Sequence, residues 1–179
     1  MIVIIDYGMG NLASVEKAIN NIDRDVIITD DKNIISKASS IILPGVGSFQ
    51  QGMKNLLERN LVNILTYEVI KKKKPFLGIC LGMQLIMERG YEPTETKGLG
   101  WIKGEVIPIE NPKLPLPHLG WNNIYSDDVK IDTIDNNFFF IHSYQVVSKE
   151  PLETTFVDYG FPILASLKKD NIFATQFHP

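Results

Sequence analysis

The strongest constraint on the fold is a pattern repeated along the first half of the chain, in which a short apolar run is followed by a loop and a helical pattern. The runs cover residues 2–5, 26–28, 41–43 and 76–79, and their continuous apolar character is typical of strands buried on both faces. Strands that alternate with helices through short connections favour an open parallel sheet covered by helices on both sides. The sequence therefore predicts an α/β fold.

The predicted helices fill the spaces between these runs. Leu12, Val15 and Ile19 lie at helical spacing after Asn11, whose side chain can cap a helix. Further helical patterns cover residues 33–37, 48–59, 61–73 and 81–89. From Gly98 onward, β-branched residues, aromatics and turns indicate strands at 105–109, 123–125, 138–144, 156–157, 163–167 and 172–177. We predict a flavodoxin-like, open and mostly parallel sheet with helices on both faces and antiparallel β additions in the C-terminal half.

Size and charge restrict the class of protein. A chain of 179 residues favours one domain spanning residues 1–179. The net charge of −3 gives no electrostatic argument for binding nucleic acid or an anionic membrane surface. No apolar run approaches the length of a membrane-spanning helix. The single cysteine rules out an internal disulfide, and we expect a cytoplasmic protein, in which a lone thiol stays reduced.

Cys80 is the residue that most clearly suggests chemistry. It follows the strand predicted at 76–79 and precedes a helix, with Gly78 and Gly82 on either side. This spacing has the layout of a nucleophile elbow, a sharp turn that needs small neighbours and sets the sulfur at a helix N-terminus, where a thiolate is favoured. The N–H of Leu81 would then face a developing oxyanion. The alternative is a buried structural cysteine, the usual state of a lone thiol.

A cysteine nucleophile needs a base, and the chain has three histidines, His118, His142 and His178. Spacing alone does not choose among them. His142 lies within an apolar strand and could be a satisfied core histidine, and His118 follows a proline-rich loop. His178 ends the strand predicted at 172–177, and a strand end can present a side chain at the edge of the sheet. We therefore expect His178 to be the base.

Loop 44–48 is the second candidate element. Because parallel strands share one carboxyl edge, it should meet two other glycine-bearing loops there, 7–10 and 78–82. Its glycines would let backbone N–H groups face a substrate. The loop could complete an oxyanion hole with Leu81, hold a phosphate at the next helix, or be an ordinary tight turn.

Several motifs, in order along the whole chain, resemble those of one enzyme family. Residues 44–47, 78–84 and 176–179 are similar to motifs of the class I, triad-type glutamine amidotransferases. Residues 6–11, 117–122 and 140–144 narrow the resemblance to the glutaminase subunits of imidazole glycerol phosphate synthase, an enzyme of histidine biosynthesis. The resemblance implies an enzyme that hydrolyses glutamine to glutamate and ammonia, without a metal or an organic cofactor.

The resemblance also implies roles for individual residues. Cys80 would attack the side-chain amide of glutamine to form a glutamyl thioester, and His178 would move the proton. The N–H groups of Leu81 and Val46 would form the oxyanion hole. The amino-acid end of glutamine would be held by Gly47, Gln84, Ser143 and Tyr144. Ammonia would pass to a cyclase or synthase subunit with a (β/α)8 barrel, across an interface that includes Asn11, Trp121 and Asn122.

The chain departs from the family pattern at its end. The family continues after the His-Pro pair with a glutamate, which would orient the imidazole as the acid of a triad does. This chain stops at Pro179, so we expect it to be truncated at the C-terminus and to lack its third triad member.

Other interpretations remain open. A paralogue could use identical chemistry to supply ammonia for the amidation of a surface-polysaccharide sugar. A non-catalytic flavodoxin-like binding module could hold a phosphate or flavin on loop 44–48, although it would have no use for a cysteine at an elbow. Trp121 could be a core residue and Asn11 only a helix cap. Neither the fold nor the family explains Trp101.

Overall fold

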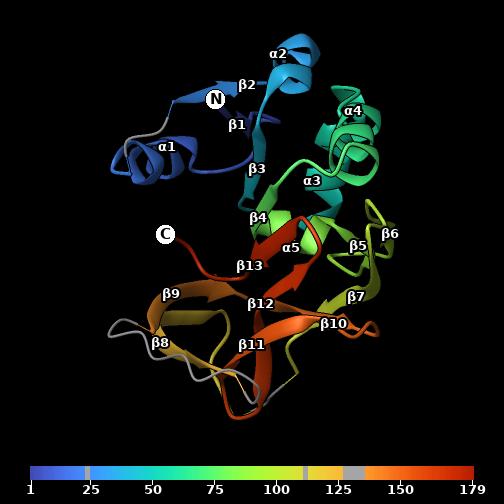
Figure 1. The fold of residues 1–179 in the computed structure, drawn as a ribbon. Helices are drawn as coiled ribbons and strands as arrows, with labels where there is room; N and C mark the ends of the chain where they lie inside the picture. Colours follow the sequence, from blue (N-terminus) through green and yellow to red (C-terminus); the bar gives the residue numbers. More distant parts are fainter. Residues whose placement is uncertain (23–24, 111–112, 127–135) are drawn as a thin grey trace.

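The computed structural model describes residues 1–22, 25–110, 113–126 and 136–179, and is built around one nine-stranded sheet (Figure 1). Five neighbouring strands of this sheet run parallel, in the order β2 (Val26–Thr29), β1 (Ile2–Ile5), β3 (Ser40–Gly45), β4 (Phe76–Cys80) and β13 (Ile172–Thr175). The predicted mostly parallel sheet is confirmed. The place of β13 beside β4 brings the end of the chain next to the strand that leads into Cys80.

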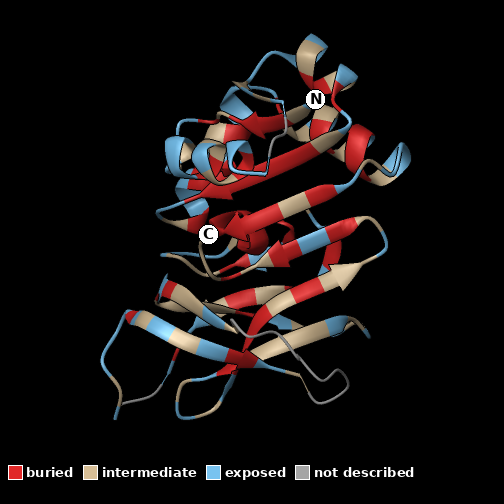
Figure 2. Ribbon diagram, turned by 60° about the vertical axis from the view of Figure 1, so that its left-hand side comes forward, coloured by how far each residue is buried: buried red, intermediate tan, exposed pale blue. Residues whose placement is uncertain are grey.

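Helices cover both faces of the parallel strands, as predicted. Alternate residues of a strand point to opposite faces. Ile4 of β1 therefore packs with Val15 and Ile19 of α1 (Leu12–Asn20), whereas Val3 and Ile5 join the core beneath the other helices. These other helices are α2 (Lys32–Lys37), α3 (Phe49–Glu58), α4 (Val62–Thr66), the π-helical turn η1 (Tyr67–Lys71) and α5 (Leu81–Leu85). Figure 2 shows the buried residues concentrated in the strands between these layers.

The second half of the chain supplies the predicted antiparallel strands. Four of them extend the large sheet beyond β13, in the order β12 (Pro162–Lys169), β11 (Glu153–Asp158), β8 (His118–Tyr125) and β9 (Asn137–His142). The other strands form a four-stranded sheet in the order β10 (Tyr144–Ser148), β7 (Ile102–Pro108), β5 (Met87–Gly90) and β6 (Thr96–Lys97). Both additions carry loops that contribute to the site described below.

Several predicted element boundaries were wrong, and three of them lie in elements that lead to the site described below. The helix predicted at 81–89 ends at Leu85, because residues 87–90 pair with β7 instead. The strand predicted at 138–144 is two strands in different sheets, with Ser143 between them and its carbonyl bound by the N–H of Ile109 at 2.9 Å. The strand predicted at 172–177 ends at Thr175. Each boundary depends on a pairing partner that is distant in sequence.

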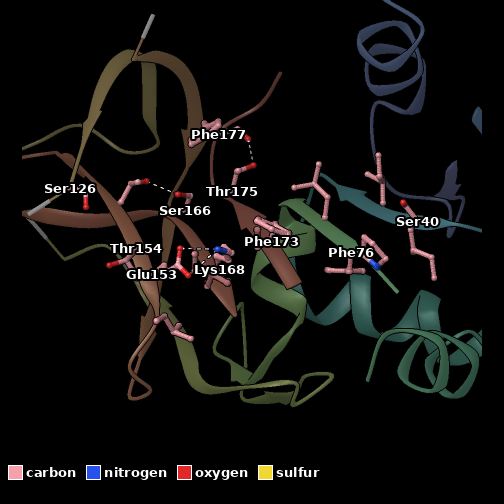
Figure 3. Close-up of a pocket in the computed structure, with 18 of the residues that line it drawn as sticks. Ser40, Phe76, Ser126, Glu153, Thr154, Ser166, Lys168, Phe173, Thr175 and Phe177 are labelled. Carbon is pink, nitrogen blue, oxygen red and sulfur yellow. Dashed lines mark hydrogen bonds and ion pairs between the residues drawn. The ribbon is translucent and has the colours of Figure 1, made fainter. Parts of the chain in front are cut away.

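The face of the sheet that carries α1 is only partly covered. A cavity of about 920 Å³ opens over β3, β4, β13 and β12, and Phe173 on its wall is 44% exposed (Figure 3). None of the residues predicted for the site lines this cavity. None of the described helices is long and apolar enough to span a membrane.

Candidate active site

Cys80 lies at a sharp turn between β4 and α5. Its backbone has a φ of 54° and a ψ of −107°, a conformation that residues with side chains rarely adopt. The turn is possible because its neighbours are small. A Cβ on Gly82 would lie 1.8 Å from the carbonyl oxygen of Leu43, and one on Gly78 would lie 2.8 Å from that of Gly82. The elbow geometry predicted from the glycine spacing is therefore present.

The loop after β3 packs against this turn. A Cβ on Gly45 would lie 2.1 Å from the hydroxyl of Tyr7 and 2.9 Å from the side chain of Leu81. Gly47 has a φ of 102°, which favours glycine, and lies against Met9. The loops that follow β1, β3 and β4 therefore meet at one edge of the sheet, as predicted.

A cavity of about 340 Å³ opens at this edge and collects most of the predicted site residues. Its walls come from the turn at Cys80, the loop after β3, and the segment that joins β9 to β10. Eight predicted residues line it: Val46, Gly47, Cys80, Leu81, Gln84, Ser143, Tyr144 and His178. Residues separated by up to 132 positions in the sequence, from Val46 to His178, are thus brought into contact with one space.

His178 reaches this cavity from beyond the end of β13. Its N–H donates a hydrogen bond to the carbonyl oxygen of Phe139 in β9, at 3.0 Å. Its Nε2 is buried and has no hydrogen-bond partner among the described residues. Burial also lowers the pKa of the imidazole, so the neutral form that can accept a proton is favoured.

The other two histidines are hydrogen-bonded to each other. His142 Nδ1 lies 2.8 Å from the carbonyl oxygen of Tyr144, and its Nε2 lies 3.0 Å from Nδ1 of His118. The second nitrogen of His118 lies 2.8 Å from the side-chain nitrogen of Asn122. Because both nitrogens of each ring are engaged, His178 is the one histidine of the three that lines the cavity with a buried ring nitrogen lacking a partner in the part of the chain that the structure describes.

The environment of the sulfur favours the protonated thiol. Burial raises the pKa of Cys80 to about 12, and the nearby carboxylate of Glu92 acts in the same direction. Two hydrogen bonds oppose this shift, one from the backbone N–H of Leu81 and one from the side chain of Gln176, whose Nε2 lies 3.5 Å from Sγ. The thiol therefore depends on a neighbouring base to release its proton during a reaction.

Glu92 is a site residue that no sequence motif indicated. It lines the cavity, and its Oε2 accepts a hydrogen bond from the N–H of Phe49 at 3.1 Å. Burial raises the pKa of its carboxyl group. The residue follows β5, a strand that the periodicity of the sequence did not predict, so its place in the site depends on that missed strand.

Gln176 is a second site residue, to which the sequence motif at residues 176–179 assigned no role. It is fully buried, and its Oε1 accepts a hydrogen bond from Nε2 of Gln84 at 3.0 Å. The same Gln84 nitrogen lies 3.4 Å from the carbonyl oxygen of Tyr144. Gln84 therefore lines the cavity, but its amide nitrogen is already engaged within the protein.

The three residues predicted at a partner interface do not line the cavity. Asn11 is exposed and caps α1, since its side chain accepts a hydrogen bond from the N–H of Ser14 at 3.3 Å. Trp121 is 69% exposed, so the alternative of a core residue is wrong. Asn122 is half-buried and binds His118.

Trp101, which no sequence argument explained, is a core residue. Its ring packs edge-on against Phe76 with centroids 5.0 Å apart, and its Nε1 donates to the hydroxyl of Thr66 at 3.1 Å.

Comparison with known proteins shows the family of the chain. The family "Glutamine amidotransferase class-I" matches residues 3–179. A protein named imidazole glycerol phosphate synthase subunit HisH 1, from Campylobacter jejuni, is 47% identical over 184 residues, covering 100% of this chain and 92% of the relative. The HisH subunit of Aquifex aeolicus is 44% identical over 183 residues, covering 99% of this chain and 87% of the relative.

Solved structures support the same fold. A crystal structure of a glutamine amidotransferase superposes with a TM-score of 0.75 at 15% identity, covering 100% of this chain and 90% of the other. The glutaminase domain of a Trypanosoma brucei protein, with bound acivicin, superposes with a TM-score of 0.63 at 15% identity, covering 99% and 85% of the two chains. From its motifs, its fold and its relatives, the chain belongs to the class I glutamine amidotransferases and, within them, to the HisH glutaminase subunits of imidazole glycerol phosphate synthase.

Proposed function

We propose that this cavity is where glutamine is hydrolysed, with Cys80 as the nucleophile and His178 as the base. The observation that carries the proposal is the meeting, in one cavity, of a thiol on an elbow turn and an imidazole whose buried Nε2 has no other partner among the described residues. A neutral imidazole is the form that can take the thiol proton, and burial favours that form.

The reaction proceeds through a thioester. As Sγ of Cys80 bonds to the side-chain amide carbon of glutamine, the thiol proton moves to His178. The proton then passes to the amide nitrogen, the C–N bond breaks, and ammonia leaves. Water adds to the thioester carbon and gives up a proton to His178. When the C–S bond breaks, His178 returns that proton to the sulfur, so that glutamate leaves and both the thiol of Cys80 and the neutral imidazole are restored.

The negative charge on the amide oxygen is held by backbone N–H groups. The N–H of Leu81 already lies within hydrogen-bonding reach of the sulfur, at the start of α5. Val46 lines the same cavity from the loop after β3. Donors fixed before the reaction stabilise an oxyanion most effectively, because they need no reorganisation as charge develops.

The amino-acid end of glutamine binds to other residues that line the same cavity. The Glu92 carboxylate suits the α-ammonium group of the substrate, because a half-buried anion gains most from a charged partner. We assign the α-carboxylate to the backbone of Gly47 and to Ser143 and Tyr144. Gln84 also lines this cavity, while its nitrogen remains bonded to Gln176 and the Tyr144 carbonyl.

The partner is a HisF-like barrel subunit that binds the outer face of β8 and β9. Apolar side chains project from this face in two cross-strand pairs, Leu119 with Ile141 and Trp121 with Phe139. Leu119, Trp121 and Ile141 are 60%, 69% and 44% exposed. A contiguous exposed apolar patch of this kind is typical of an interface. Ile141 also lines the cavity, so a partner seated there would lie beside the route by which ammonia leaves.

Two polar residues complete the proposed interface. Asn122 follows Trp121 on β8, and its side chain points to the other face of the strand, where it binds His118 directly behind the apolar surface. Asn11 follows Gly10, and a Cβ on Gly10 would lie 3.6 Å from the backbone of Gly45, one residue before Val46. We also propose that the enzyme works in the cytoplasm, where its single thiol stays reduced.

The test is glutamate release by the chain alone, with its barrel subunit, and with the barrel and its ribonucleotide substrate. We expect release that rises with each addition and is absent in Cys80→Ala. No release from the complete mixture would overturn the proposal. Release with the barrel but no amination of the histidine-pathway ribonucleotide would instead favour the paralogue that serves polysaccharide synthesis.

A further inference from the structure

An uninterrupted chain of hydrogen bonds joins the surface of β8 to the sulfur of Cys80. It uses six side chains and one carbonyl group, and most of its members are buried. From the surface inward it runs through Asn122, His118, His142, the Tyr144 carbonyl, Gln84, Gln176 and Cys80. The catalytic steps above use only its last member.

The direction of every hydrogen bond in this chain is fixed by the Tyr144 carbonyl, which can only accept. His142 must therefore carry its proton on Nδ1, 2.8 Å from that oxygen, and its Nε2 must accept. The donor to this Nε2, 3.0 Å away, is Nδ1 of His118. The other nitrogen of His118 then accepts from the amide of Asn122, at 2.8 Å. Both histidines are satisfied as neutral rings.

The same carbonyl fixes the orientation of the two glutamine amides. Gln84 must present its nitrogen, not its oxygen, toward Tyr144, at 3.4 Å. That nitrogen also donates to Oε1 of Gln176 at 3.0 Å, which turns the Gln176 nitrogen toward Sγ, 3.5 Å away. If the Gln176 amide were reversed, its oxygen would face the sulfur and repel a thiolate.

Burial makes these orientations hard to change. The exposed fractions of His118, His142, Gln84 and Gln176 are 1%, 6%, 4% and 0%. A buried amide or imidazole that loses its partner is left with an unsatisfied polar group, so the loss of one hydrogen bond weakens the next one in the chain. Burial lowers the pKa of His118 and brings that of His142 to about 4, which keeps both rings neutral.

We propose that His118 and His142 are positioning residues that hold the Gln84 and Gln176 amides, and so set the reactivity of Cys80 from the β8–β9 hairpin. A partner bound on that hairpin would act on Cys80 through the same hydrogen bonds. This part of the inference rests on the proposed function, because it needs the partner to bind there. The effect on the sulfur does not, since it requires only the isolated chain.

The test uses alkylation of the single cysteine by iodoacetamide, followed between pH 7 and 10. The groups facing the sulfur are the N–H of Leu81 and the side chains of Gln176, Glu92 and Tyr7. Gln176→Leu removes the amide donor, and we expect alkylation at pH 8 to slow about tenfold, one pKa unit, because a hydrogen bond to the thiolate is lost.

The decisive variants are made at His118, which, among the described residues, is linked to the sulfur only by way of the other members of the chain of hydrogen bonds. His118→Phe keeps an aromatic ring stacked between Phe140 and Tyr159 but cannot donate to His142. We expect alkylation to slow about threefold, less than in Gln176→Leu, because four further hydrogen bonds lie between the lost one and the sulfur. His118→Asn keeps an N–H at the same point along the side chain and should restore the wild-type profile.

The control is Asn123→Ala, which removes an exposed hydrogen bond to Asn137 on the same hairpin and should leave alkylation unchanged. A His118→Phe variant with a lower melting temperature but the wild-type alkylation profile would show that the pair is only structural. Nitrogen NMR of the wild-type histidines needs no variant to fold. A proton on Nε2 of His142 at pH 7 would break the hydrogen-bonded chain and overturn the proposal.

These outcomes are distinguishable from a failure of the proposed function. Alkylation reports on the sulfur whether or not glutamine is a substrate. An unchanged profile in His118→Phe, in an enzyme that releases glutamate normally, would overturn the positioning role alone.

Discussion

His178 is held against β9 by one backbone hydrogen bond, from its N–H to the carbonyl oxygen of Phe139 at 3.0 Å. This contact, rather than a continuous strand, places the imidazole at the cavity, because β13 ends three residues earlier at Thr175. The base we assign is thus tied to the same hairpin that carries the proposed partner surface. The two features can be separated by the variants below.

Cys80→Ala should abolish glutamate release while leaving the fold and partner binding intact. Removal of a small, buried sulfur at the end of β4 takes away the nucleophile and leaves the surface unchanged. A glutamine-analogue electrophile should label the wild-type chain once, at its single cysteine, as measured by mass spectrometry. Full activity in Cys80→Ala would exclude a thioester.

His178→Asn should lower glutamate release by about 10²–10⁴-fold, the usual contribution of a general base. His142→Asn should cost much less, because both nitrogens of His142 are already hydrogen-bonded and only position other groups. Steady-state rates with the barrel present would compare the two. A dead His142→Asn alongside an active His178→Asn would reverse the assignment.

The same assignment predicts a pH dependence. A base must be neutral, so activity is lost as the pH falls through its pKa. Burial lowers the pKa of His178 below its ordinary value, so the acid limb of the kcat/KM profile should lie below about pH 6.5. An acid limb above about pH 6.5 would indicate that the charged imidazolium of His178 is stabilised, which would contradict the effect of burial on its pKa.

Glu92→Gln should raise the KM for glutamine by about tenfold to a hundredfold, because the lost charge pair contributes to binding and each 1.4 kcal/mol is tenfold. The kcat should change less, since the carboxylate is assigned to the amino-acid end and not to the reacting amide. Glu95→Gln, which removes an exposed partner of Arg89, is the matched control. A change confined to kcat would place Glu92 at the chemistry instead.

Features that depend on neighbouring residues in the sequence were predictable, whereas features that depend on contacts between distant residues were not. The parallel strands and the turn at Cys80 were predictable, because apolar runs and the Gly78 and Gly82 spacing are local signals. Glu92 and Gln176 were not. Gln176 is satisfied by Gln84, a residue 92 positions away, and no local pattern encodes that contact.

The histidines show the same division. Sequence patterns could not choose among His118, His142 and His178, because all three lie near strands. The choice depends on which ring nitrogens already have partners. These partners depend on strand register, since β8 and β9 pair His118 opposite His142. Nε2 of His178 has no partner among the described residues.

Trp121→Ala should weaken the stimulation of glutaminase by the barrel more than it weakens folding. The side chain is 69% exposed, so its removal should change the free energy of unfolding by no more than about 0.5 kcal/mol. A tryptophan at the centre of an interface can contribute about 2 kcal/mol, roughly 30-fold in Kd. Calorimetric titration with the barrel would measure it. Unchanged affinity and coupling in a folded variant would move the interface elsewhere.

Extension of the chain beyond Pro179, beginning with a glutamate, should raise both the rate of glutamate release and the melting temperature. Residues two apart on an extended segment face the same way, so the new carboxylate could orient His178 and stabilise its charged form during the reaction. The equivalent acid of a serine triad is worth about 10⁴-fold. We expect about tenfold to a hundredfold here, because a cysteine depends less on that help.

The stability gain has a separate cause and a separate control. Added residues that cover the open cavity beside Phe173 and Phe177 would bury apolar surface, at roughly 25 cal/mol per Å². An otherwise identical extension that begins with glutamine should therefore raise the melting temperature equally but leave the rate low. If the 179-residue chain already matches the glutamate-bearing extension in rate, with barrel and substrate present, then the imidazole of His178 needs no orienting acid.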